Sequence, residues 1–152
     1  MEWFVKAFLK ASLAWLGLGV TLGVAMAAHP AWAVYRAAHM HMNLLGFVTM
    51  MIYGVAYHVI PRFTGAPLYS RRLAGAHVWT ATTGLAAMVA GFLLLPHLPR
   101  EGRWVLVAGG ILSVAAAYLF IVNIWRTLNA APRPARQAPT QARPLAVLQQ
   151  RP

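Results

Sequence analysis

Residues His39 to Ile60 read HMHMNLLGFVTMMIYGVAYHVI, a long apolar run that opens on two histidines. The run is long enough to cross a bilayer, which takes about 20 residues of α-helix. An ionisable side chain inside a bilayer is costly, so it usually has a ligand or a polar partner. His39 and His41 are two positions apart, or about 200° around a helix. We therefore expect the two imidazoles to face different neighbours, whereas histidines that chelate one metal ion from one helix lie four positions apart.

Three more apolar runs of comparable length accompany this one. The four predicted spans are Phe4–Ala28, His39–Ile60, Leu73–Leu95 and Trp104–Trp125. Hydrophobic residues make up 60% of the 152 residues and charged residues 10%, whereas a soluble domain has about 25% charged residues. Short connections between the spans favour antiparallel neighbours. The sequence thus predicts an all-α fold, an integral membrane antiparallel four-helix bundle.

The chain divides into two parts by composition. Residues 1–128 hold the four-span transmembrane bundle, and residues 129–152 form a basic tail of Pro, Arg, Gln and Ala that is typical of disorder. The first span admits a second interpretation, because Lys6 and Lys10, the apolar run and Ala31-Trp32-Ala33 resemble a signal peptide with its cleavage site. Its apolar core is longer than the usual length of about 7–15 residues, which favours a retained span.

Basic residues greatly outnumber acidic residues, 13 to 2. Such an excess can indicate nucleic-acid binding, but no soluble binding fold remains once the spans are removed, so we expect no nucleic-acid partner. Cations in membrane proteins instead set the topology and contact anionic lipid. The more basic side holds Lys6, Lys10, Arg62, Arg71, Arg72, Arg126 and the arginines of the tail, and the other side holds Arg36, Arg100 and Arg103 with Glu101. The positive-inside rule therefore predicts that both termini, including the tail, are cytoplasmic.

The histidines are the candidate ligands for a metal or cofactor. The chain has no cysteine, which excludes Cys-ligated iron–sulfur clusters and covalently attached c-type heme. His39 and His41 are the first candidates for axial ligation of heme iron, and the alternative is a pair of interfacial histidines bonded to water or headgroups. His29 and His97 lie on the same predicted side and are secondary candidates for the second axial position. Their proline neighbours favour ordinary loop residues.

Two further histidines lie toward the opposite side of the membrane. His58 is about 25 Å further along the helix axis than His41, so one heme cannot join these two. A pairing of His58 with His77 is a secondary candidate for a metal or heme site on the inner side. The alternative, which we favour, is that both are interfacial or bonded to the backbone.

Arginines and methionines add two further candidates. Arg36, Arg100 and Arg103 lie on the side of the candidate histidines and suit heme propionates, because guanidinium pairs well with carboxylates. The alternative is that they are ordinary charges at the level of the headgroups. Thioether and imidazole groups suit Cu(I), so Met40 and Met42 beside His39 and His41 make copper an alternative cofactor. Methionine in an apolar helix more often only packs.

The second span resembles the tenth helix of subunit I of the heme-copper oxidase superfamily, and it most resembles the C-type (cytochrome cbb) branch. The matching residues are His39-Met40-His41, Leu45-Gly46-Phe47 and the end Gly54-Val55-Ala56-Tyr57-His58-Val59-Ile60-Pro61-Arg62. Ala76-His77-Val78-Trp79 is similar to the start of the eleventh helix, and the loop Leu98–Arg103 is similar to the family's arginine-bearing loop. In order, the four spans resemble the last four helices of that subunit over about residues 5–127.

The resemblance implies roles for the two leading histidines and a cellular location. It assigns His39 to a high-spin heme and His41 to a low-spin heme in a bacterial-type inner membrane. The family's other low-spin ligand, its copper-site histidines and its cross-linked tyrosine come from helices that have no counterpart in this sequence. We therefore do not expect this chain alone to reduce oxygen, and whether it is an enzyme stays open. Bis-histidine ligation would need another histidine of the chain or one from a neighbouring copy.

The function predicted is that of a b-type heme protein of the membrane. It would carry one or two hemes per protomer, or hemes shared between protomers of a homo-oligomer. It would act in electron transfer, with quinol or cytochrome c as donor, or bind a diatomic gas such as oxygen or nitric oxide. The alternatives are a copper-binding membrane protein and a non-catalytic structural subunit of a respiratory complex.

Overall fold

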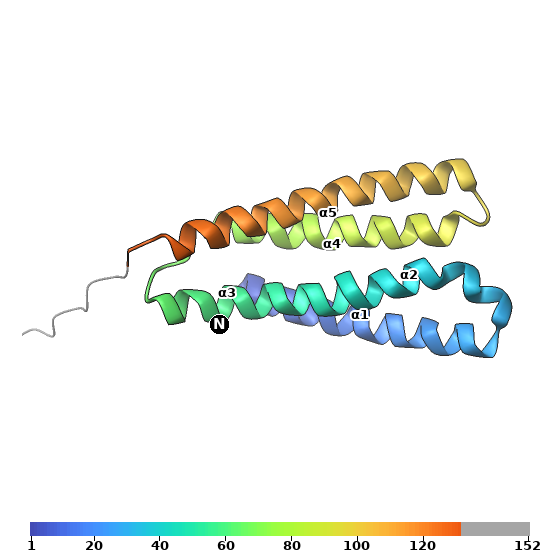
Figure 1. Ribbon diagram of the computed structural model, residues 1–152, viewed down its shortest axis with the longest axis horizontal. Coiled ribbons are helices and arrows are strands. Elements are labelled where there is room, and N and C mark those ends of the chain that lie inside the picture. Colours follow the sequence, from blue (N-terminus) through green and yellow to red (C-terminus); the bar gives the residue numbers. More distant parts are fainter. Residues whose placement is uncertain (132–152) are drawn as a thin grey trace, which may run out of the picture.

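The computed structural model of the protein describes residues 1–131, which form a bundle of long helices (Figure 1). The elements are α1 (Trp3–Ala28), the 3₁₀ helix η1 (Pro30–Tyr35), α2 (Arg36–His41), the π-helix η2 (Met42–Thr49), α3 (Met50–Thr64), α4 (Arg71–Leu94) and α5 (Pro99–Leu128). Within these residues there is no strand, and four helical segments are long and apolar enough to cross a membrane. The predicted all-α membrane bundle is confirmed. From residue 132 onward, the predicted tail lies outside the described residues.

The helices are longer than the hydropathy pattern predicts. The second membrane-crossing segment is helical from Pro30 to Thr64, well beyond the predicted run His39–Ile60, and α5 begins at Pro99 instead of Trp104. Proline is favoured in the first turn of a helix, where its missing N–H costs nothing, so Pro30 and Pro99 both mark helix starts. Hydropathy identifies the part of each helix inside the hydrocarbon and not the turns that project beyond it.

Two helix hairpins make up the bundle, and Figure 1 shows α4 beside α5 and α1 beside the segment from α2 to α3. Glycines bring α4 and α5 into backbone contact. A Cβ atom on Gly109 would lie 2.4 Å from the backbone nitrogen of Met88, and one on Gly91 would lie 2.6 Å from that of Leu106. Small residues of this kind allow transmembrane helices to approach closely.

An amide clamp fixes the connection between α3 and α4 onto α5. The Asn123 side chain is fully buried. Its Oδ1 accepts a hydrogen bond from the backbone N–H of Ser70 at 3.0 Å, and its Nδ2 donates to the carbonyl of Ser70 at 2.9 Å. The hydroxyl of Thr127 accepts from the backbone N–H of Tyr69 at 3.0 Å. Ser70 in turn caps α4, because its Oγ accepts from the N–H of Leu73.

Candidate functional site

His39 stands on α2 and turns toward α1. Its Nδ1 lies 2.8 Å from the backbone carbonyl oxygen of Gly19. A carbonyl oxygen only accepts, so Nδ1 is the protonated nitrogen and donates this hydrogen bond. The lone pair of the neutral ring is therefore on Nε2. A Cβ atom on Gly23 would lie 2.8 Å from Cε1 of His39, so the imidazole occupies space that only a glycine leaves free.

Asn43 completes this contact one turn further along the chain. Its Nδ2 donates to the backbone carbonyl of His39 at 2.9 Å. A Cβ atom on Gly19 would lie 2.7 Å from Nδ2 of Asn43, so the two glycines of α1 receive the side chains of Asn43 and His39 in turn. Sequence reasoning missed Asn43. Its signal was a strongly polar side chain within an apolar run, one helical turn after a candidate ligand.

His41 turns toward α4 instead. Its Nδ1 lies 2.8 Å from the carbonyl oxygen of Ala37 in the preceding turn, and its ring centroid lies 4.7 Å from that of Phe92 on α4. By the same argument as for His39, Nδ1 donates and Nε2 carries the lone pair. The two imidazoles thus face different helices, as their spacing predicts.

A π-helical stretch follows the histidine pair directly. η2 begins at Met42, and in it the hydroxyl of Thr49 donates to the carbonyl of Leu44, five residues back, at 2.8 Å. Gly46 within this stretch lets Trp15 of α1 pack close, since a Cβ atom on Gly46 would lie 2.6 Å from Cβ of Trp15. π-Helical segments are rare and frequently accompany functional sites. No pattern in the sequence predicts this one.

A groove between α1 and α4 contains Met42, the residue that follows His41. It has a volume of about 480 Å³ and is lined by Gly17, Leu18, Thr21, Leu22, Ala25, Trp32, Met42 and Leu93. Met42 follows His41 in the chain, and Leu93 follows the Phe92 on which the His41 ring packs. The volume lies within the range of about 300–1,000 Å³ that small-molecule and cofactor pockets have.

The other two histidines at this end of the bundle have partners of their own, and the three candidate arginines are exposed. Nε2 of His97 lies 2.8 Å from the hydroxyl of Tyr35, and this hydrogen bond ties the α4–α5 connection to η1. The ring of His29 packs on Trp32 with centroids 5.4 Å apart. Arg100 and Arg103 line one groove of about 420 Å³ together with Pro99 and Trp104, and Arg36 is exposed at the start of α2.

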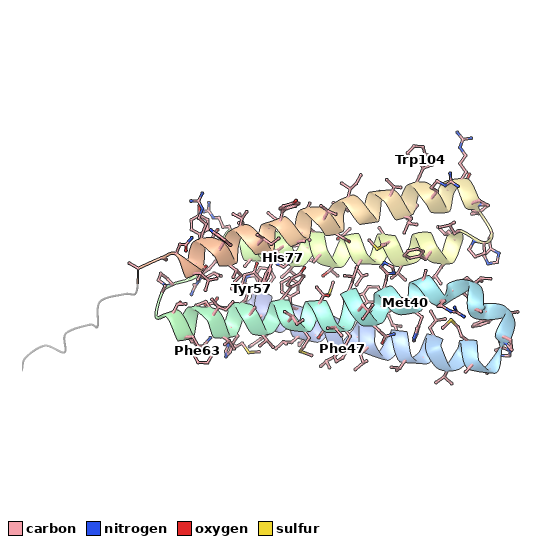
Figure 2. All side chains as sticks on the ribbon, viewed as in Figure 1. Met40, Phe47, Tyr57, Phe63, His77 and Trp104 are labelled. Atoms are coloured by element: carbon pink, nitrogen blue, oxygen red, sulfur yellow. The ribbon has the colours of Figure 1, made fainter. Side chains whose placement is uncertain are left out.

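His77 is buried at the other end of the bundle, where Figure 2 shows it beside Tyr57. The expectation that His77 would be interfacial or bonded to the backbone is wrong. The side chain is fully buried, its Nδ1 lies 3.0 Å from the hydroxyl of Tyr57, and its Nε2 has no hydrogen-bond partner within residues 1–131. Rings from three other helices enclose it, at centroid distances of 4.7 Å for Phe8, 4.5 Å for Tyr53 and 5.6 Å for Phe120.

His58 is not part of this buried cluster. Its Nδ1 lies 3.1 Å from Nη1 of Arg62, one turn further along α3, and that guanidinium also donates to the carbonyl of His58. His58 and His77 therefore have separate partners. Across residues 1–131, no group of three or more His, Cys, Asp or Glu side chains is arranged to hold a metal ion.

Comparison with known proteins supports the resemblance drawn from the second span. No family model matches the chain. The chain is 27% identical to cbb3-type cytochrome c oxidase subunit CcoN1 of Stutzerimonas stutzeri, over 84% of this chain and 33% of that protein. It is 26% identical to cytochrome c oxidase subunit 1 of Rhodobacter capsulatus, over 68% of this chain and 24% of that protein. It is 33% identical to cytochrome c oxidase polypeptide 1 of Halobacterium salinarum, over 44% and 12%.

The predicted resemblance to subunit I of the heme-copper oxidases is confirmed at low identity. The chain spans about a third or less of the length of these curated relatives. Together with the four membrane-crossing helices, this similarity describes a membrane protein related to the oxidase subunit.

Proposed function

We propose that this membrane protein binds b-type heme through the Nε2 atoms of His39 and His41. The observation that carries the proposal is the hydrogen bonding that the two rings share. Each ring donates its Nδ1–H to a backbone carbonyl. Histidines that bind metals almost always donate the other ring N–H to a carbonyl, a carboxylate or water, which fixes the tautomer and raises the basicity of the ligand. When bound, heme supplies an iron atom that exchanges one electron or holds a diatomic gas.

The two histidines of one protomer do not ligate the same iron atom. His39 faces α1 and His41 faces α4, so their Nε2 atoms do not converge on one point. The protein therefore carries two hemes, or one heme with a second ligand from a neighbouring copy in a homo-oligomer. An interface with two-fold symmetry would place the same histidine of both copies on opposite sides of a shared heme. Such a bis-histidine iron favours electron transfer, from quinol or cytochrome c, and an open sixth position favours the binding of oxygen or nitric oxide.

Charge supports the orientation of the heme end in the membrane. The end that carries His39 and His41 also carries Arg36, Arg100 and Arg103, which can pair with the heme propionates. Fewer cations lie at this end than at the other, so it faces away from the cytoplasm, and both termini are cytoplasmic in a bacterial inner membrane.

The remaining histidines fit the ligand role less well. His97 already bonds to Tyr35, His58 bonds to Arg62, and His77 is enclosed by aromatic rings. His29 packs on Trp32 at an exposed helix end. A copper site made of His39, Met40, His41 and Met42 also finds little support, because the two imidazoles diverge, Met40 is exposed and Met42 is buried.

The heme content of the purified protein tests this proposal. The full chain is expressed in heme-replete cells, purified in neutral detergent and assayed for heme b by its pyridine hemochrome. We expect one or two hemes per protomer, or one per two protomers, and a lower content in His39→Ala and His41→Ala. His58→Ala is the matched control and keeps the wild-type ratio. An equal heme content in all four proteins would overturn the ligand assignment, and absence of heme with copper present would favour the copper alternative.

A further inference from the structure

A large groove opens at the end of the bundle that carries the N-terminus, opposite the proposed heme end. Its volume is about 780 Å³, and its walls come from the start of α1, the end of α3, the α3–α4 connection and the start of α4. Three arginines line it, Arg62, Arg71 and Arg72, against one carboxylate, Glu2. The groove is therefore a cationic site at the level where a membrane-spanning helix meets the headgroups.

Among residues 1–131, one of the three arginines has a carboxylate partner and the other two do not. Nη2 of Arg71 lies 2.5 Å from Oε1 of Glu2, and this is the one ion pair found among the described residues. Arg62 and Arg72 thus face the groove without a carboxylate partner within residues 1–131, although Arg62 donates to the carbonyl of His58. Guanidinium groups bind phosphate oxygens through paired hydrogen bonds, so the free donors suit a phosphate better than a neutral ligand.

Apolar and aromatic side chains form most of the remaining groove, together with Ser70. Phe4, Pro61, Pro67 and Leu68 line it together with the rings of Tyr57 and Tyr69. The wall that contains Ser70 is held in place by Asn123, which bonds to both the N–H and the carbonyl of that residue. A site with cations at its rim and apolar walls fits an amphiphile that has an anionic headgroup, and a fixed wall reduces the ordering cost of binding.

We propose that this groove binds an anionic phospholipid, with the phosphodiester held by Arg62 and Arg72 and an acyl chain lying along Pro61 and Leu68. Basic pockets between transmembrane helices recognise lipid headgroups in this way. Glu2 acts as an internal competitor, because it occupies Arg71 and adds a negative charge to the site. The site is separate from the histidines of the proposed heme end, so neither proposal depends on the other.

Native mass spectrometry of the full chain in neutral detergent tests the lipid site. Phosphatidylglycerol is titrated against the wild-type protein, Arg62→Gln/Arg72→Gln and the control Lys6→Gln/Lys10→Gln. The control removes the same charge from α1 residues at the same end of the bundle that do not line the groove. A basic side chain that contacts the headgroup contributes about fivefold to the binding of anionic lipid, so we expect about 30-fold weaker binding in the arginine variant. Lys6 and Lys10 do not line the groove, so we expect less than about threefold in the control.

Two further sets of titrations test the effect of the Glu2 charge on lipid binding and whether the ligand is a lipid or free phosphate. Glu2→Gln should strengthen phosphatidylglycerol binding by about fivefold, because it frees Arg71 and removes the competing charge. Phosphatidylcholine and inorganic phosphate are titrated in parallel and should bind far more weakly than phosphatidylglycerol. Equal losses in the arginine and lysine variants, equal binding of phosphatidylcholine, or inorganic phosphate binding as tightly as the lipid would each overturn the proposal.

Discussion

Nδ1 of His39 lies 2.8 Å from the carbonyl oxygen of Gly19, so the backbone of α1 orients an imidazole that belongs to the next helix. His41 differs, because its Nδ1 bonds to Ala37 of its own helix. The orientation of His39 therefore depends on how closely α1 approaches α2, and that of His41 does not. A substitution on α1 can therefore disturb the orientation of His39 and leave that of His41 intact, with both histidines still present.

Gly23→Leu should displace His39. A Cβ atom at position 23 would already lie 2.8 Å from Cε1 of His39, and a leucine adds three more carbons there. We expect heme affinity at the His39 site to fall about 10- to 100-fold, as it does when the outer-shell support of a metal ligand is lost. Heme titration of the purified apoprotein measures this change.

Gly17→Ala is the control for this substitution. It lies on the same helix, and no atom of residues 1–131 is within 4 Å of its added Cβ atom. Gly17 lines the groove that contains Met42 and does not contact His39, so we expect unchanged heme affinity at the His39 site. We expect a stability equal to or slightly above wild type, since alanine favours a helix over glycine by about 1 kcal/mol. If Gly23→Leu bound heme as tightly as Gly17→Ala, the α1 backbone would not position the ligand.

Alanine substitutions at the adjacent glycines Gly109 and Gly110 of α5 should have different effects on stability. A Cβ atom on Gly109 meets the backbone nitrogen of Met88 at 2.4 Å, which cannot move aside without shifting α4. One on Gly110 meets only the flexible Cε of Met88, at 3.8 Å. Gly109→Ala should lower the free energy of unfolding by about 1–3 kcal/mol, whereas Gly110→Ala should not lower it. Unfolding in mixed detergent micelles measures both, and equal stabilities would contradict the backbone contact.

The Tyr57–His77 hydrogen bond should show strong coupling. Tyr57→Phe leaves Nδ1 of a fully buried His77 without its partner, which should cost about 1–3 kcal/mol. His77→Phe replaces an imidazole that already has one orphaned nitrogen, so the double variant should be more stable than Tyr57→Phe alone. A double-mutant cycle of unfolding free energies measures the coupling. Additive losses would show that the pair does not form this bond.

Loss of the Asn123 amide should weaken the contact between α5 and the α3–α4 connection. Asn123→Ala leaves the N–H of Ser70 without its partner and removes one of the two hydrogen bonds to the Ser70 carbonyl, which still accepts from the N–H of Ala74. We expect a loss of about 1–3 kcal/mol. Asn129→Ala removes the same group from an exposed position at the end of α5 and serves as the control. Proteolysis at the connection should increase only in the first variant, and equal cleavage of both would argue against the clamp.

Periodicity and hydropathy predict the features of this chain that depend on one helix at a time. The number of spans follows from the length of the apolar runs, and the divergence of His39 and His41 follows from 3.6 residues per turn. Helix ends were predicted less well, because Pro30 and Pro99 begin helices several residues before the predicted apolar runs.

Features that depend on neighbouring helices were not predictable in the same way. The burial of His77 was missed, since its place near a span end says nothing of the rings of Phe8 and Phe120 that other helices bring around it. The support given to His39 by Gly19 and Asn43, and the π-helical stretch after His41, likewise arise from contacts between helices.

The most direct test of heme ligation is the dithionite-reduced minus oxidised visible spectrum of the detergent-purified full chain. His39→Ala and His41→Ala are measured in parallel, with His77→Phe as a buried-histidine control. We predict a b-type α band in the wild-type protein that at least one of the first two substitutions weakens, by about half with two hemes and completely with one, and that His77→Phe leaves unchanged. A featureless spectrum from protein made in heme-replete cells, or a band of wild-type intensity in both alanine variants, would contradict the assignment of His39 and His41 as heme ligands.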